Sequence, residues 1–183
     1  PPMATEDNRL VPPERFGVRV MSMGFFQKKE EEAMIWRGPM VHNAITQLLQ
    51  STEWGELDFL VIDLPPGTSD SPLTVMQSIP MDGFVVVTTP QELAKIDAMR
   101  SINMIRTLRV DVLGVVENFA GEIFGSGAGE ELARELDISF LGRLEMRADY
   151  RDTSKPTVLN SEAVLSEYGH IVEQTRLALQ KVE

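Results

Sequence analysis

The chain has 183 residues, of which 43% are hydrophobic and 25% charged, as in a globular protein and unlike a disordered one. Its formal net charge of −11 disfavours nucleic-acid binding, because an acidic surface repels phosphate backbones and no basic patch interrupts it. No apolar stretch is long enough to span a bilayer and no signal peptide opens the chain, so we expect a cytoplasmic protein with no membrane partner.

The predicted elements alternate along the chain. In order, they are a strand at 18–23, a helix at 40–50, strands at 59–62 and 84–88, a helix at 91–108, a strand at 112–116, a helix at 127–136, a strand at 138–141 and a helix at 162–182. Several of the strands are almost wholly apolar, which is typical of strands buried on both faces, and the helices carry amphipathic stripes. We therefore expect one α/β domain over residues 1–183, with a mostly parallel sheet flanked by helices on both faces and an irregular segment at 1–17.

The ends of the predicted strands hold the candidate binding residues, because ligands of open α/β sheets bind beyond the carboxyl ends of the strands. Asp63 follows the strand at 59–62, and a carboxylate that ends a buried strand needs a partner, for which hydrated Mg²⁺ is suitable. Gly67 follows a stiff Pro-Pro turn and permits close approach of the backbone to a ligand such as a terminal phosphate. The alternative is that Asp63 only caps the turn.

The later strand ends give weaker signals. Thr88 and Thr89 are better explained as the N-cap of the next helix than as hydroxyls that face a ligand. Asn118 offers a donor and an acceptor that can read a purine edge, although asparagine is also common in turns. The glycine-rich segment at 125–130 lacks the G-x-G-x-x-G spacing, so a flexible loop before a capped helix explains it better than a phosphate site does.

Several segments, taken in order, resemble one family. They are VMSMGF at 20–25, WRGPM at 36–40, LDF at 57–59 leading into VIDLPPGT at 61–68, VTTPQ at 87–91, GVVEN at 114–118 and IFGSG at 123–127. Their order resembles the Mrp/ApbC/Nbp35 family of P-loop ATPases, relatives of MinD and ParA, from about Val18 to the C-terminus. The resemblance implies a homodimer that binds ATP and Mg²⁺ and passes iron–sulfur clusters to client proteins.

The resemblance also implies roles for four residues. Asp63 would hold Mg²⁺ through water, Gly67 would lie near the γ-phosphate and Asn118 would read adenine. Arg37 falls in a segment that lies near the nucleotide and the dimer face in the family.

Two parts of the family pattern are absent from the sequence. There is no G-x-x-x-x-G-K-[ST] phosphate loop, which family members carry on a strand upstream, and no C-x-x-C pair between the VEN and IFGSG segments. With no cysteine, this chain cannot ligate an iron–sulfur cluster through thiolates. Either the sequence omits segments of the natural protein, or the natural protein is truncated and has changed its role.

Three functions fit these observations. The first is an ATP-binding iron–sulfur cluster carrier, which is an ATPase when its phosphate loop is present. The second is a truncated relative that binds or hydrolyses a simpler nucleotide such as AMP, using Asp63 and the glycine-rich loop. The third is a non-catalytic module for dimerisation or partner binding.

Overall fold

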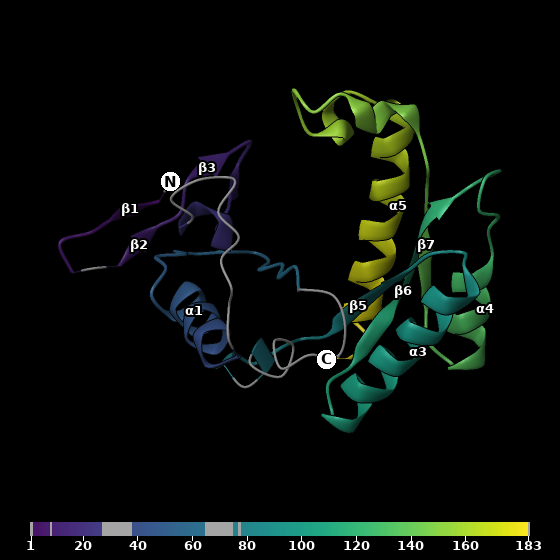
Figure 1. Cartoon of the computed structure of the whole chain (residues 1–183), viewed down its shortest axis with the longest axis horizontal. Coiled ribbons are helices and arrows are strands. Elements are labelled where there is room, and N and C mark those ends of the chain that lie inside the picture. Colours follow the sequence, from purple (N-terminus) through teal and green to yellow (C-terminus); the bar gives the residue numbers. More distant parts are fainter. Residues whose placement is uncertain (1, 8, 27–37, 65–74, 77, 183) are drawn as a thin grey trace. The chain divides into compact units, whose positions relative to one another are not determined.

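The computed structural model describes residues 2–7, 9–26, 38–64, 75–76 and 78–182 (Figure 1). Its contacts divide the chain into two compact units, Pro1–Pro80 and Met81–Glu183. Each unit is described by itself below, and the organisation of the whole chain as one domain stays a prediction.

The Pro1–Pro80 unit begins with two short antiparallel hairpins within and just after the segment that we expected to be irregular. Strand β1 (Met3–Ala4) pairs with β2 (Leu10–Val11), and β3 (Glu14–Arg15) pairs with β4 (Val18–Arg19). A 3₁₀ helix, η1 (Met23–Phe26), and helix α1 (Gly38–Gln50) follow. The prediction of a strand at 18–23 was therefore wrong in extent and pairing. The two residues between β3 and β4, Phe16 and Gly17, both have positive φ, as a tight hairpin turn requires, and so turn this run back onto β3.

The apolar run at 59–62 forms no strand, contrary to the prediction. Phe59 is 63% exposed and Val61 is 89% exposed. A strand must pair its backbone N–H and C=O groups with a neighbour, and none of the described strands pairs with this run. The apolar pattern therefore shows that the side chains are apolar, but it does not show whether a neighbouring strand is present to pair with them.

The Met81–Glu183 unit has the predicted α/β architecture. Its sheet contains β5 (Phe84–Thr88), β6 (Val112–Ala120) and β7 (Phe140–Glu145), in that order and all parallel. Its helices are α3 (Glu92–Thr107), α4 (Ala128–Glu135), the short 3₁₀ turns η2 (Ala148–Arg151) and η3 (Thr157–Leu159), and α5 (Glu162–Leu179). The parallel sheet and its flanking helices confirm the predicted fold class.

Helices cover both faces of this sheet, as Figure 1 shows. Val116 packs with Leu141, Leu144 and Ala178, so α5 covers one face of β6 and β7. The next side chain along β6, Glu117, points to the opposite face, where α4 begins. Alternate residues of one strand therefore meet different helices, which explains why the sequence of β6 is almost continuously apolar.

A glycine allows α5 to lie close to the sheet. Gly142 in β7 has φ +140°, and a Cβ atom there would lie 2.9 Å from Cγ1 of Ile171 in α5. This contact is tighter than side chains normally make, so glycine is required for the packing of α5 on β7. None of the helices in the described part of the chain is long and apolar enough to cross a membrane.

Candidate functional site

The carboxyl ends of β5 and β6 place polar side chains next to each other. Thr88, the last residue of β5, is in register with Glu117 of β6, and both side chains are buried. Asn118 follows Glu117 directly and is partly exposed at the same edge of the sheet. This is the edge at which open parallel sheets bind ligands.

The carboxylate of Glu117 is fully buried and accepts three backbone hydrogen bonds. Gly127 N donates to both carboxylate oxygens at 2.9 Å, and Gly129 N donates to Oε2 at 2.7 Å. Gly127 is the N-cap residue of α4 and has no side chain with which to cap the helix. Glu117 therefore caps α4 from a neighbouring strand and also satisfies its own buried charge.

The contacts of Glu117 show that the glycine-rich segment at 125–130 forms the start of α4. A helix begins there, as expected, but its cap comes from Glu117 and not from a local residue. The amides of Gly127 and Gly129, which would cradle a phosphate, already donate to a carboxylate. The carboxylate of Glu117 thus takes the place that a bound phosphate would have at these amides.

Asn118 lies near the end of β6 and shapes the backbone there. Its Oδ1 accepts a hydrogen bond of 2.9 Å from Phe119 N, and Phe119 adopts a left-handed φ of +59°. This local bond stabilises a conformation that costs energy for a residue with a Cβ atom. The NH₂ group of the Asn118 amide takes no part in this contact.

Thr88 and Thr89 do not cap the helix that follows them, contrary to our interpretation. The N-cap residue of α3 is Gln91, whose side chain makes no capping bond. Thr88 Oγ1 donates to Thr89 O at 3.4 Å instead. The threonines therefore belong to the end of β5, and the helix begins later than the N-cap pattern indicates.

The end of β7 carries a cation that is held by a carboxylate. Arg147 donates to Oε1 of Glu167 through Nε at 2.9 Å and through Nη2 at 2.6 Å. The hydrogen bond to Glu167 raises the pKa of Arg147 above its ordinary value. Nearby, burial and then the neighbouring Tyr168 raise the pKa of Tyr150. Because Arg147 is hydrogen-bonded to Glu167 of α5, it links the segment after β7 to this helix.

The other predicted site residues lie elsewhere or are not described. Asp63 is exposed and does not follow a described strand. Arg37 and Gly67 lie outside the described residues. Asp63 belongs to the Pro1–Pro80 unit and Asn118 to the Met81–Glu183 unit. Within the described ranges, no group of three acidic, histidine or cysteine side chains is arranged to hold a metal ion.

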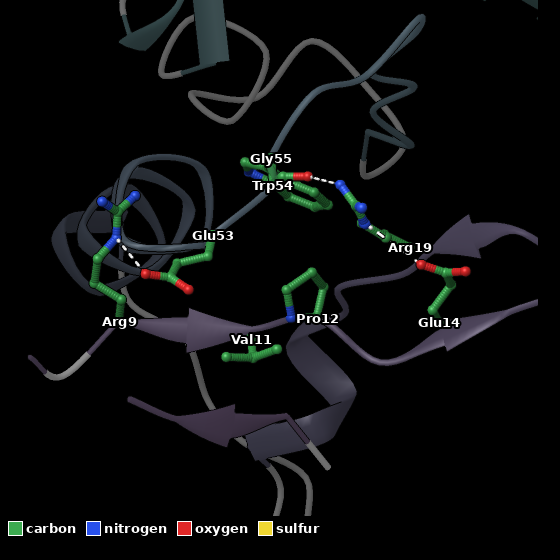
Figure 2. Close-up of a pocket in the computed structure, with 8 residues that line it drawn as sticks. All are labelled: Arg9, Val11, Pro12, Glu14, Arg19, Glu53, Trp54 and Gly55. Carbon is green, nitrogen blue, oxygen red and sulfur yellow. Dashed lines mark hydrogen bonds and ion pairs between the residues drawn. The ribbon is translucent and has the colours of Figure 1, made fainter. Parts of the chain in front are cut away.

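A surface cavity of about 570 Å³ lies in the Pro1–Pro80 unit (Figure 2). It is lined by Arg9, Val11, Pro12, Glu14, Arg19, Glu53, Trp54 and Gly55. Arg9 lies 3.7 Å from Glu53, and Arg19 lies 3.5 Å from Glu14 and also donates to the carbonyl oxygen of Trp54. Both cations of the cavity are therefore already paired, and the sequence analysis singled out none of these residues.

Glu117 is the site residue that sequence reasoning missed, although a signal existed. A charged residue inside a run of buried apolar residues needs a partner, and two glycines stand ten and twelve residues later where a helix begins. We assigned the neighbouring asparagine to the site and gave the glutamate no role.

A parallel sheet between two layers of helices, with polar residues near the carboxyl ends of its strands, defines an open α/β protein of the kind that binds ligands at that edge. The model of the ParA family described as "NUBPL iron-transfer P-loop NTPase" matches residues 2–176, and the chain belongs to this family. This result confirms the resemblance that the ordered segments indicated.

Individual relatives agree with the family. The chain is 41% identical over 181 residues to an iron–sulfur cluster carrier protein of Methanocaldococcus jannaschii, covering 91% of this chain and 61% of that protein. It is 41% identical over 163 residues to the iron–sulfur cluster transfer protein NUBPL of Dictyostelium discoideum, covering 84% of this chain and 50% of that protein. The chain therefore spans only about half to two-thirds of the length of these relatives.

Solved structures show the same fold. A nucleotide-binding protein of Archaeoglobus fulgidus in complex with ADP matches with a TM-score of 0.65 and 30% identity, covering 97% of this chain and 64% of that chain. The cell division ATPase MinD of Pyrococcus furiosus matches with a TM-score of 0.60, 18% identity and coverage of 74% and 58%. At this identity, the likeness to MinD bears on the fold alone.

Proposed function

We propose that this chain is the part of an iron–sulfur cluster carrier that binds Mg²⁺ and ATP at the carboxyl edge of its parallel sheet. The observation that carries the proposal is the position of Asn118 near the carboxyl end of β6, in a chain that is 30% identical to a protein solved with ADP. The iron–sulfur part of the proposal is supported by two relatives of 41% identity whose names give that role.

The residues have distinct proposed roles. The amide of Asn118 would read the adenine edge, since an amide can donate to and accept from a base. The exposed carboxylate of Asp63 suits a hydrated Mg²⁺, which keeps most of its waters and neutralises phosphate charge. By resemblance, Gly67 would lie near the γ-phosphate and Arg37 near the nucleotide and the dimer face.

The cluster is cargo in this proposal and is not held by thiolates of this chain. The segment between Asn118 and Gly125, where relatives usually carry C-x-x-C, is Phe-Ala-Gly-Glu-Ile-Phe here. In this proposal the chain contributes residues to the nucleotide site, and the given sequence, which has no cysteine, supplies no thiolate ligand for the cluster. ATP hydrolysis, a homodimer, iron–sulfur client proteins and a cytoplasmic location complete the proposal by resemblance.

The alternative functions are less well supported. A simple-nucleotide site built on the glycine-rich loop would have to displace the carboxylate of Glu117 from Gly127 and Gly129. The relatives give no support for an AMP enzyme or for a non-catalytic module.

The proposal is tested by calorimetric titration of the full-length gene product with ATP, GTP and AMP, with and without Mg²⁺. We expect ATP to bind most tightly in the presence of Mg²⁺. Asp63→Asn should reduce the effect of Mg²⁺, while Asp58→Asn, an exposed aspartate five residues earlier, should not. Asn118→Ala should reduce the preference for adenine over guanine, while the exposed Asn103→Ala should not. Failure of the full-length product to bind ATP and to accept a cluster under anaerobic reconstitution would refute the proposal.

A further inference from the structure

A single carboxylate connects the end of β6, which contains Asn118, to the start of α4. Glu117 lies three residues before the end of β6, and its side chain bonds to Gly127, immediately after the loop at 121–126. The third bond, from Gly129 N to Oε2, also fixes the first turn of α4. The chain on both sides of the loop is thus held by one fully buried side chain.

Inside this closure, the loop has a defined shape. Gly121 and Gly125 exchange two backbone hydrogen bonds, of 2.9 Å and 2.8 Å, which form a small hairpin at the tip. Met146 N donates to Ala120 O at 2.9 Å, which ties the last residue of β6, directly before the loop, to the residue after β7. On the other side, the contacts that return the chain to the sheet are those of Glu117.

We propose that Glu117 is a positioning residue, whose carboxylate sets the orientation of Asn118 and of the loop at 121–126 for recognition of the base. This inference rests on the proposed function, because it assumes that a nucleotide lies at this edge. Glu117 does not touch the nucleotide. It acts through the backbone of the end of β6 and of the loop that follows it.

The chemistry of the contact explains why this position holds a carboxylate. The ionised group has only acceptors, and here it accepts three hydrogen bonds from two N–H donors. Glutamine would direct an NH₂ group at one of the glycine amides, so that two donors would face each other. The same junction is tight, because a Cβ atom at Gly129 would lie 2.9 Å from Cβ of Glu117.

Two variants disturb this junction by different means. Glu117→Gln changes its hydrogen bonding at almost constant volume, and Gly129→Ala changes its spacing at constant charge. Glu122→Gln is the control, because it makes the same chemical change at an exposed position in the same loop. The measurements are hydrogen exchange of the Gly121 and Gly125 amides and the ratio of dissociation constants for ATP and GTP, both in the full-length gene product.

We expect both variants to speed the exchange of these amides and to lower the preference for ATP over GTP, each by about tenfold, the equivalent of roughly one hydrogen bond. The control should leave both quantities unchanged. If Glu117→Gln lowers Tm but changes neither the exchange nor the ratio, Glu117 is only structural and the inference is wrong. Absence of nucleotide binding by the wild-type protein would instead refute the proposed function, and exchange alone would then decide whether Glu117 orders the loop.

Discussion

The Nζ atom of Lys95 in α3 lies 2.9 Å from Oε1 of Glu135 in α4, and it lies equally close to Oε2 of Glu131. Lys95 is only 7% exposed, so this contact joins the two helices that cover one face of the sheet. Hydrogen bonds to Glu135 and then to Glu131 raise the pKa of Lys95 above its ordinary value of 10.5. The hydrogen bond between Lys95 and Glu131 lowers the pKa of Glu131 below its ordinary value of 4.5.

Replacement of the lysine should change how stability depends on pH. Because the pKa of Glu131 is lower in the folded state, its contribution is present above about pH 4.5 and is lost as pH falls through the lowered value. Because the pKa of Lys95 is raised, its contribution is present below pH 10.5 and is lost as pH rises through the raised value. Lys95→Met should therefore lower Tm at neutral pH and flatten the fall of Tm in acid.

Thermal melts followed by circular dichroism between pH 3 and pH 7 measure this effect. The exposed Lys155→Met is the control and should leave the acid limb of the curve unchanged. Parallel curves for Lys95→Met and the wild type would show that the ion pair does not couple α3 to α4.

Two glycines of the Met81–Glu183 unit should respond to alanine in opposite directions. At Gly142, φ is +140° and the new Cβ would meet Cγ1 of Ile171 at 2.9 Å, so we expect Gly142→Ala to destabilise by about 1–3 kcal/mol. Gly169 lies within α5 with open space around it, so Gly169→Ala should stabilise by about 0.5–1 kcal/mol. Urea unfolding measures both, and the same sign for the two variants would contradict the packing of α5 on β7.

Truncation of the core beneath α5 should be costly. Leu141 is fully buried in β7 and packs with Val116, Leu144 and Ala178. Leu141→Ala should lower the free energy of unfolding by about 2–5 kcal/mol, because it removes apolar contacts and leaves a cavity. Leu165→Ala, on the exposed side of α5, should change it by less than about 0.5 kcal/mol. Equal losses in urea titrations would show that α5 buries a different face.

The sequence predicted most of the Met81–Glu183 unit because each element there carries its own signal. The strand at 84–88 was placed with its observed bounds, and the helix at 162–182 was placed within three residues of its observed end. Strand β5 pairs with β6 within the sheet and α5 packs on β6 and β7, so periodicity and burial agree for both segments. The extension of β6 to Ala120 was missed, because Glu117 interrupts the apolar run and its partners lie ten and more residues away.

The candidate site was predicted less completely than the fold. Asn118 lies at the expected edge, but the neighbouring Glu117 has a role that depends on hydrogen bonds to Gly127 and Gly129, ten and twelve residues further along the chain. Thr88 was misread because the N-cap preference does not tell a strand end from a helix start. Roles for Arg37, Gly67 and Asp63 stay predictions.

The exposed run at 59–62 gives the sharpest test of sequence pattern against structure. Val61 is 89% exposed, so Val61→Lys should change the free energy of unfolding of this chain by less than about 0.5 kcal/mol. Val86 in β5 is the matched control, since it is buried within a paired strand and Val86→Lys would bury a charge without a partner. A loss for Val61→Lys as large as that for Val86→Lys, measured by urea unfolding of both variants, would show that the run is buried, as its apolar sequence predicts.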